Sequence, residues 1–243
     1  MAKTTPRLHV EASLADGTDL TLGTEQSHYL AHVLRLSCGD AVRLFNNKHG
    51  EVLAYITTVA KKSVSLRCER QVHAVQPPPD IDYVFAPLKH QRLDYLVQKA
   101  TELGARRLQP MITARTIAER VNLDRMRANV IEAAEQCNLV FVPEVLEPKS
   151  FASLMKNWDQ NRAIIFCDET ATIADPRAAL SKLRPPAAVF VGPEGGFTEE
   201  ERGLLKSMPN GAAISLGPRI MRADTAAVAA LALVQATIGD WQS

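Results

Sequence analysis

The chain has 243 residues with a net charge of +1, and 46% of its residues are hydrophobic. This length predicts one large domain or two smaller ones with a substantial core, and the near-neutral charge argues against indiscriminate binding of nucleic acid through a broad basic surface. No apolar run is long enough to span a membrane and the first ten residues lack the apolar segment of a signal peptide, so we expect a cytoplasmic protein.

The stretch before Pro77-Pro78-Pro79 predicts a small β-rich domain. Runs at 41–45, 51–56 and 63–67 alternate apolar and polar residues and are separated by Gly, Asp and Asn, which is typical of strands joined by turns. Residues 27–36 have the pattern of a short amphipathic helix. The three prolines favour an extended linker, so we expect a β-barrel domain over residues 1–72.

After the prolines the pattern changes to alternating strands and helices, which indicates an α/β domain over residues 78–243. Apolar runs suited to strands buried on both faces of a parallel sheet alternate with amphipathic helical patterns. The predicted strands are 83–86, 107–112, 163–167, 187–191 and 212–216, and the predicted helices are 92–104, 123–137 and 223–238.

The four cysteines lie far apart and form no CxxC pair, so we expect no zinc site and no other metal. In a chain without a secretion signal, Cys38, Cys68, Cys137 and Cys167 are interpreted as reduced, small core residues.

Two loops that follow predicted buried strands are the candidates for chemistry. One is Gly192–Phe197 and the other is Gly217–Thr225. Ligands of open α/β sheets bind beyond the carboxyl ends of the strands, and glycine lets the backbone approach a ligand closely. The first loop is neither a Walker A motif nor GxGxxG. Its simplest alternative interpretation is a tight turn into a helix capped by Thr198 and Glu201.

The two loops together resemble the C-terminal motifs of the ribosomal small-subunit RNA uridine N3-methyltransferases (RsmE), of the SPOUT superfamily. The matching stretches are Gly192-Pro-Glu-Gly-Gly-Phe-Thr-Glu-Glu-Glu and Leu216-Gly-Pro-Arg-Ile-Met-Arg-Ala-Asp-Thr-Ala. Residues 28–40, 89–104 and 132–137 resemble further segments of the family in the same order. Three positions depart from the family pattern: Asn138-Leu139 replace Gly-Arg, Asp224 replaces Glu, and Met221 replaces Leu.

The resemblance implies a PUA-like barrel at 1–72 followed by a SPOUT domain at 78–243 whose parallel sheet ends in a trefoil knot. It also implies a homodimer that uses S-adenosylmethionine to methylate a uridine N3 in 16S ribosomal RNA, within the small ribosomal subunit. The helix at 223–238 is apolar nearly all round, which suits either a central core helix or a dimer interface.

The resemblance implies a catalytic set and a cofactor-binding set of residues, most of them in the two loops, and a set of RNA contacts elsewhere in the chain. The catalytic set is Arg219, Arg222 and Asp224, in which the arginines stabilise the charge that develops on the uracil oxygens. The base is open between Asp224, Glu102 and Glu194, and Asp224 is equally suited to capping the last helix. The cofactor set is Cys167, Gly192, Pro193, Glu194, Gly195, Gly196, Leu216, Gly217, Ile220, Met221 and Thr225.

The expected RNA contacts are Arg7 and Arg35 in the barrel, and Lys89, Arg92 and Lys99 in and near the helix at 92–104; Arg43 is a weaker candidate. The helix residues also fit a solvated charged edge with a Lys99–Glu102 pair. Two other functions would use the same features. A phosphate-binding hydrolase or kinase lacks the necessary lysine and metal carboxylates, and a non-catalytic RNA-binding ribosome-assembly factor would not need Arg219, Arg222 and Thr225.

Overall fold

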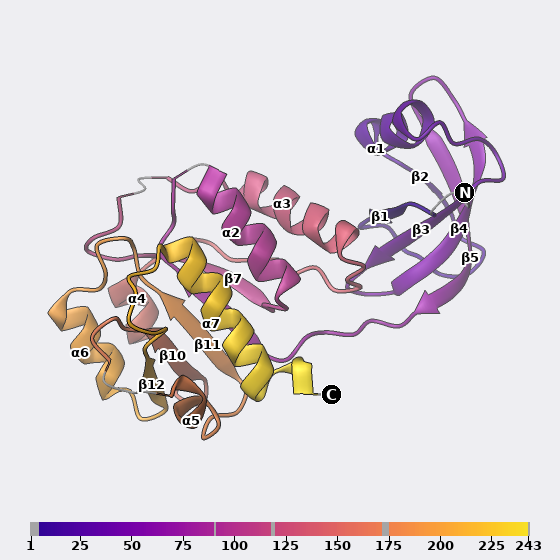
Figure 1. Cartoon of the computed structure of the whole chain (residues 1–243). Coiled ribbons are helices and arrows are strands. Elements are labelled where there is room, and N and C mark those ends of the chain that lie inside the picture. The colour runs from indigo at the N-terminus through magenta and orange to yellow at the C-terminus, as the bar shows by residue number, and fades with distance from the viewer. Residues whose placement is uncertain (1–4, 90, 118–119, 172–174, 243) are drawn as a thin grey trace. The chain divides into compact units, whose positions relative to one another are not determined.

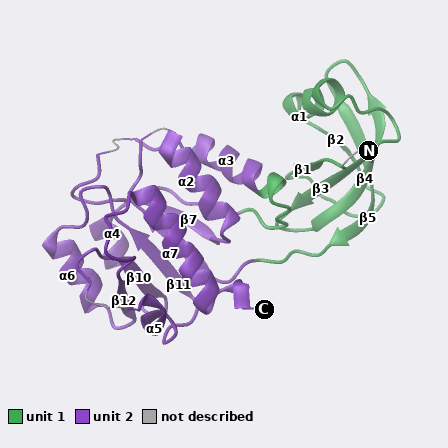
Figure 2. Ribbon diagram, in the orientation of Figure 1, with its two compact units in different colours: residues 1–77, 134–142 green, residues 78–133, 143–243 purple. Residues whose placement is uncertain are grey.

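The computed structural model describes residues 5–89, 91–117, 120–171 and 175–242. The chain forms two compact units (Figure 2). The first contains residues 1–77 together with 134–142, and the second contains residues 78–133 and 143–243. No helix within the described ranges is long and apolar enough to cross a membrane.

The first unit is built on a mixed five-stranded sheet in the order β1-β3-β4-β5-β2 (Figure 1). β1 runs parallel to β3, and the other neighbours are antiparallel. In the two long strands, alternate residues are buried in one core, as the alternating pattern predicts: Val52, Ala54 and Ile56 of β4, and Val64, Leu66 and Cys68 of β5. The strands are β1 (Arg7–His9), β2 (Asp19–Thr21), β3 (Ala41–Asn46), β4 (Gly50–Val59) and β5 (Val64–His73).

The helix predicted at 27–36 is partly wrong. Helix α1 spans Thr24–His28 and continues as one π-helical turn, η1 (Tyr29–Val33). In that turn the N–H of Leu34 donates to the carbonyl of Tyr29, five residues back. Arg35 then takes a left-handed backbone conformation with φ of 55°, and the last helical residue, Val33, lies three residues before the predicted limit.

The second unit contains a parallel sheet in the order β12-β10-β11-β6-β7-β8, with β9 pairing to β7. Helices lie against it, which confirms the α/β class (Figure 1). The strands are β6 (Ile81–Phe85), β7 (Arg107–Ile112), β8 (Glu144–Val145), β9 (Lys149–Ser150), β10 (Ala163–Cys167), β11 (Ala187–Val191) and β12 (Gly211–Ile214). The helices are α2 (Gln91–Glu102), α3 (Leu123–Gln136), α4 (Phe151–Lys156), α5 (Pro176–Leu180), α6 (Glu199–Ser207), α7 (Ala223–Ile238) and η2 (Asp240–Gln242).

Strands β6 and β11 are buried along their whole length. The continuous apolar run of β11 predicts this burial, whereas β6 also buries Asp82, which is paired with Arg107 and Arg162. Helix α7 begins and ends at the predicted residues and packs against α2, α5 and β11. Ala227, Ala230 and Leu231 face this core, whereas Val228 and Leu233 stay half-buried. Packing in the core therefore explains one side of α7, whereas the apolar side chains of Val228 and Leu233 on the rest of the helix are only partly covered.

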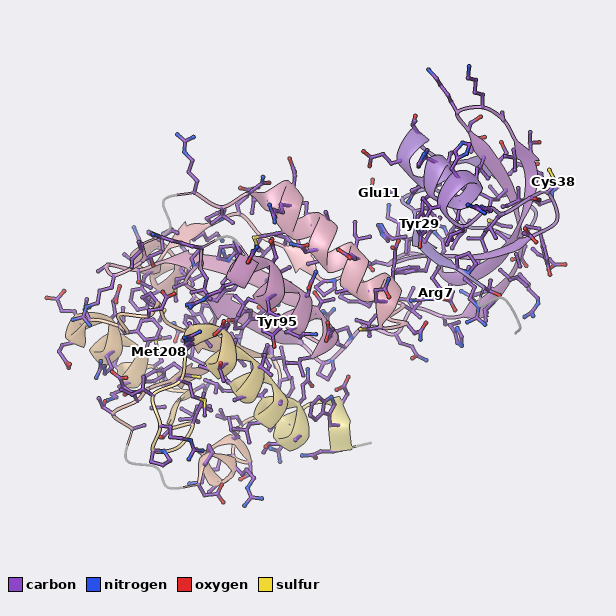
Figure 3. The ribbon with its side chains drawn as sticks, turned by 45° about the horizontal axis from the view of Figure 1, so that its top comes forward. Arg7, Glu11, Tyr29, Cys38, Tyr95 and Met208 are labelled. Atoms are coloured by element: carbon purple, nitrogen blue, oxygen red, sulfur yellow. The ribbon has the colours of Figure 1, made fainter. Side chains whose placement is uncertain are left out.

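The expectation that all four cysteines are core residues is wrong for two of them. All four are free thiols, but Cys38 and Cys137 are exposed. Cys38 lies at the surface of the first unit (Figure 3). Cys68 is buried in the core of the first unit, and Cys167 lies at the end of β10.

Candidate functional site

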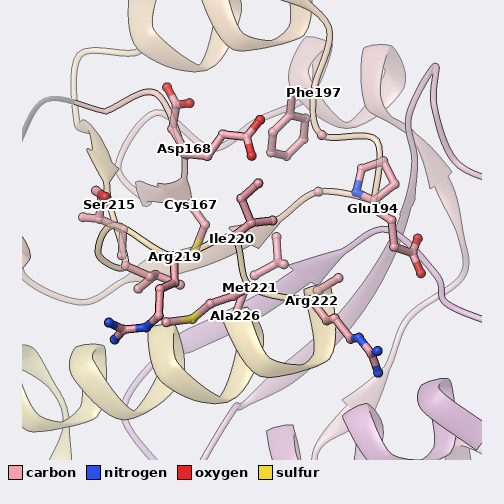
Figure 4. Close-up of a pocket in the computed structure, with 18 of the residues that line it drawn as sticks. Cys167, Asp168, Glu194, Phe197, Ser215, Arg219, Ile220, Met221, Arg222 and Ala226 are labelled. Carbon is pink, nitrogen blue, oxygen red and sulfur yellow. The ribbon is translucent and has the colours of Figure 1, made fainter.

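A pocket of about 290 Å³ lies beyond the carboxyl ends of β10, β11 and β12 (Figure 4). Its place follows from the register of the sheet. Cys167 on β10 pairs with Ile214 on β12, and Phe166 pairs with Phe190 on β11. The chain therefore leaves all three strands at the same edge, where open parallel sheets bind their ligands. The lining residues are Cys167, Asp168, Glu169, Val191, Gly192, Pro193, Glu194, Gly196, Phe197, Arg202, Ile214, Ser215, Leu216, Gly217, Arg219, Ile220, Met221, Arg222, Ala223 and Ala226.

The structure brings most of the predicted cofactor residues together in this pocket. Gly195 and Thr225 do not line it. The carbonyl of Gly195 instead accepts a hydrogen bond from Arg115, and Thr225 is exposed in the first turn of α7. Their assignment as cofactor contacts stays a prediction.

The predicted catalytic residues divide in the same way. Arg219 and Arg222 line the pocket, and their guanidinium groups point away from one another (Figure 4). Asp224 does not line the pocket, and its Oδ1 accepts the N–H of Thr225. The alternative role of Asp224 as an N-cap is wrong, because the N-cap of α7 is Arg222 and Asp224 lies inside the first turn. In this first turn the negative charge of Asp224 interacts favourably with the positive end of the helix dipole.

Asp168 is a pocket residue that the sequence analysis missed. It is buried, its Oδ1 accepts hydrogen bonds from the backbone and hydroxyl of Thr170, and its Oδ2 lies 3.0 Å from Lys206 Nζ. Although burial alone would raise it, the pKa of Asp168 is lowered overall by these partners. The pocket therefore contains an ionised carboxylate that is flanked by two cations, Lys206 and Arg202, and Arg202 also lines the pocket. The available signal was an Asp-x-Thr sequence directly after a predicted buried strand.

Cys167 carries no charge in this pocket. Burial raises the pKa of its thiol to about 12, so the thiol stays protonated at neutral pH. Since the thiolate is the nucleophilic form of cysteine, Cys167 can form a wall of a site for an alkylating ligand without competing for the alkyl group.

Contacts with helix α6 and with the segment after β7 hold the Gly192–Phe197 loop in place. The predicted cap is confirmed: Thr198 and Glu201 form a reciprocal capping box at the start of α6. Glu201 is buried, and its other oxygen accepts the N–H of Ala114 at 2.9 Å. Arg115 donates to the carbonyl of Gly195 at 2.7 Å. The loop after β7 thus holds the glycine loop in place.

Replacing Gly196 with a bulky residue should prevent a cofactor from binding in this pocket. Its φ of 68° lies in the left-handed region, and no atom lies within 4 Å of the position that a Cβ would take at this residue. In Gly196→Leu we expect a side chain at the pocket wall and a backbone strain of about 1–2 kcal/mol, with loss of cofactor binding in calorimetry.

Gly17→Leu is the matched control for this strain. Gly17 has a φ of 75° with equally open surroundings, but it lies in the first unit. Both variants should lower the thermal midpoint to a similar degree, and only Gly196→Leu should lose the cofactor. Normal binding by Gly196→Leu would show that the cleft is misplaced.

The predicted RNA-contact residues of the second unit lie near a second hollow, of about 610 Å³. Lys89 and Arg92 line it, and Arg92 Nη1 lies 3.6 Å from Glu194 Oε1. Lys99 does not line it; its ammonium group pairs with Glu102 at 2.7 Å, as the alternative interpretation of this helix edge predicts.

In the first unit the structure gives Arg7 a different role from the expected phosphate contact. Its side chain is only 6% exposed, and it pairs with the buried Glu51. The remaining guanidinium nitrogens donate to the carbonyls of Ala134, Glu135 and Leu139 at 2.9–3.0 Å. These are carbonyls at and just beyond the end of α3, so Arg7 is a helix-capping residue, and each of its three guanidinium nitrogens already donates to a protein acceptor.

The other two basic candidates of the first unit remain accessible. Arg35 is exposed. Arg43 has 40% of its side chain exposed and lies 3.6 Å from Glu51. Their contact with RNA stays a prediction.

Comparison with known proteins gives a consistent result over the whole chain. Residues 76–235 match the RNA methyltransferase domain family, and residues 22–68 match the RNA methyltransferase PUA domain family. The chain is 32% identical to ribosomal RNA small subunit methyltransferase E of Rickettsia conorii, over 94% of each chain. It is 30% identical to the protein of the same name from Bacillus subtilis, over 86% of this chain and 87% of that one.

Solved structures agree in fold and in ligand. The structure of ribosomal RNA small subunit methyltransferase E from Neisseria gonorrhoeae, bound to S-adenosyl methionine, superposes with a TM-score of 0.87 at 27% identity, over 98% of this chain and all of that chain. A Legionella pneumophila protein in complex with SAM superposes with a TM-score of 0.84 at 28% identity, over 98% and 99% of the two chains.

Proposed function

Because this chain belongs to the RNA methyltransferase family and to its branch of small-subunit methyltransferase E proteins, we propose that it methylates a uridine N3 of 16S ribosomal RNA with S-adenosylmethionine. The observation that carries the proposal is the pocket at the carboxyl ends of β10, β11 and β12, built from the two glycine-containing loops. Catalysis is assigned to residues 78–243 and RNA binding by the PUA-like fold to residues 1–72.

The pocket residues fit S-adenosylmethionine. Gly192, Gly196 and Gly217 line the pocket without a side chain, so a ligand can approach their backbone closely, and Phe197 and Ile220 offer apolar surface to a purine ring. The carboxylate of Asp168 can accept hydrogen bonds from ligand hydroxyl or amino groups. When bound, the cofactor supplies an electrophilic methyl group on a sulfonium sulfur.

The protein's own contribution is positioning and charge stabilisation. Deprotonation of uridine N3 spreads negative charge onto the two neighbouring carbonyl oxygens. Arg219 and Arg222 extend from the loop that lines the pocket, and a guanidinium group donates several hydrogen bonds while keeping its charge. We assign these arginines to the developing anion.

Incubation with radiolabelled S-adenosylmethionine and small ribosomal subunits that lack the modification tests this function. We expect label in 16S ribosomal RNA at a uridine N3, and preferably in assembled subunits, because the net charge of +1 suits recognition of a structured particle better than of naked RNA. Binding of subunits without methyl transfer would instead identify a non-catalytic assembly factor. The cytoplasm, where ribosomal subunits are assembled, is the proposed location.

We expect the active form to be a homodimer. Two features support it: Ile220, on the loop that lines the pocket, is 91% exposed, and Val228 and Leu233 leave an apolar remainder on α7. The divergent directions of Arg219 and Arg222 also suit a site completed by a second copy (Figure 4). Sedimentation should give twice the 26.6 kDa of one chain, and a fully active monomer would contradict the proposal. The trefoil knot stays a prediction of the family resemblance.

A further inference from the structure

The hollow beside the cofactor pocket shares one side chain with it. Glu194 lines both cavities, whereas no other residue appears in both linings as the structure describes them. In Figure 4 its carboxylate points outward, on the side away from Cys167 and Asp168. The remaining lining residues of the hollow are Pro87, Leu88, Lys89, Gln91, Arg92 and Ile117.

The sheet makes this adjacency a fixed property of the fold. β6 and β11 are parallel neighbours in which Phe85 pairs with Val191. One residue further, the N–H of Ala86 donates to the carbonyl of Val191 at 3.0 Å. The loops that follow the two strands therefore leave the sheet side by side, one lining the hollow and the other lining both the hollow and the cofactor pocket.

The lining of the hollow has the chemistry of a pyrimidine site. Pro87, Leu88 and Ile117 offer apolar surface to the faces of a ring, and Lys89 and Arg92 offer donors to carbonyl or phosphate oxygens. A volume of about 610 Å³ accommodates a nucleotide withdrawn from the RNA. At the side of the hollow that adjoins the cofactor pocket lies a hydrogen-bond acceptor, the carboxylate of Glu194.

Of the three carboxylates considered as the base, Glu194 is the one that the geometry favours. Glu102 is held by Lys99 at 2.7 Å, and neither it nor Asp224 lines either cavity. Glu194 has a single described ion-pair partner, Arg92 at 3.6 Å, and 44% of its side chain is exposed. That long, exposed contact leaves the carboxylate open to a substrate N–H.

On the basis of the proposed function, we propose that the target uracil occupies this hollow and that Glu194 accepts its N3 proton. The proton first moves from N3 to a Glu194 oxygen and then to water, which leaves an electron pair on N3. This pair attacks the methyl carbon, the N–C bond forms as the C–S bond breaks, and the sulfur keeps the electron pair of that bond. Arg92 is a positioning residue that orients the carboxylate toward the hollow.

Glu194→Gln tests the proton acceptor while keeping the shape of the side chain. Glu194 is also one of the predicted cofactor residues, but its carboxylate points out of the cofactor pocket (Figure 4), so we expect cofactor affinity within about twofold of wild type. The single-turnover rate on small subunits should be at least about 100-fold lower at neutral pH. Without the acceptor only uracil already deprotonated at N3 reacts, so the rate of the variant should rise about tenfold per pH unit, whereas the wild-type rate should change little.

Glu199→Gln is the matched control, because Glu199 begins α6 five residues later and is 89% exposed at its side chain. It should behave as wild type. A Glu194→Gln rate near wild type, or a loss that pH does not restore, would overturn the proposal. Absence of methyl transfer by the wild-type protein would overturn the proposed function instead.

Gln91→Trp tests the hollow independently of the acceptor. Gln91 is exposed at the start of α2, and a bulky ring there should fill the space that the uracil needs. We expect a KM for subunits raised at least about tenfold, with unchanged cofactor affinity. Wild-type KM and rate in this variant would place the target base elsewhere.

Discussion

Arg7→Ala should lower the free energy of unfolding by about 3–5 kcal/mol, the usual cost of removing one member of a buried ion pair. Glu51, whose side chain is 2% exposed, would lose its buried partner and keep only His73 and the more distant Arg43. The carbonyls of Glu135 and Leu139 would lose the Arg7 donor at the same time, whereas the carbonyl of Ala134 would keep the N–H of Leu139.

The measurement has to report on the first unit. Trp158 and Trp241 both belong to the second unit, so tryptophan fluorescence is a poor probe. Calorimetry combined with hydrogen exchange of the peptide 134–142 is better suited, and the peptide should lose protection.

Arg67→Ala is the control for Arg7→Ala, because Arg67 pairs with Asp19 and both side chains are 62% exposed. Such a pair contributes about 0–1 kcal/mol. Equal midpoints for the two variants would contradict the capping role of Arg7.

The ion pairs of Glu51 make the first unit sensitive to acid. Burial alone would raise the pKa of Glu51, but hydrogen bonds from Arg7 and His73 lower this pKa overall. A carboxyl whose pKa is depressed in the folded state contributes stability above its unfolded pKa, and this contribution is lost as the pH falls through the folded value. Acid unfolding of the first unit should therefore begin below the ordinary range of glutamate, and earlier in Arg7→Ala.

Arg222→Ala should reduce the single-turnover rate of methyl transfer by about 30- to 1,000-fold. This corresponds to about 2–4 kcal/mol of transition-state stabilisation, comparable to the loss of one oxyanion donor. The substitution removes a guanidinium group that extends from the loop lining the pocket. Cofactor affinity should change much less, because the charge to be stabilised appears only during transfer.

Arg219→Ala separates the two pocket arginines, and Arg177→Ala is the control. Arg177 is 73% exposed in the second unit, where it pairs with Asp175. Its replacement should leave transfer unchanged. Near-wild-type transfer by both Arg219→Ala and Arg222→Ala would refute the arginine mechanism.

The sequence predicted the elements whose own residues determine them. Helix α7 and strands β7, β10 and β11 have the predicted bounds, because long apolar runs and periodic faces reveal buried elements. The two- and three-residue strands β1, β2, β8 and β9 were missed. Such strands form because a partner strand lies beside them, so they carry no pattern of their own.

The same distinction applies to the site. The pocket loops were recognisable because each follows a buried strand and contains glycine. Arg7 was predicted to contact RNA because no residue near it in the sequence indicates another partner. Its carbonyl acceptors lie 127 to 132 positions further along the chain. Asn138, which stands where the family usually has glycine, has a φ of 57°, a left-handed conformation that glycine adopts readily and asparagine tolerates. The departure from the family pattern therefore suits the backbone at residue 138 and places an apolar side chain, Leu139, where the family usually has a basic one.

The distribution of the first unit over two stretches of chain has a consequence for biosynthesis. Residues 134–142 belong to that unit but are translated after the first 56 residues of the second unit, 78–133. Until more than 130 residues have left the ribosome, Arg7 of the nascent first unit is paired with Glu51 but lacks the helix end that it caps. A fragment that stops at the proline linker should be arrested in this state, whereas supplying the later stretch in trans as a peptide should allow it to mature.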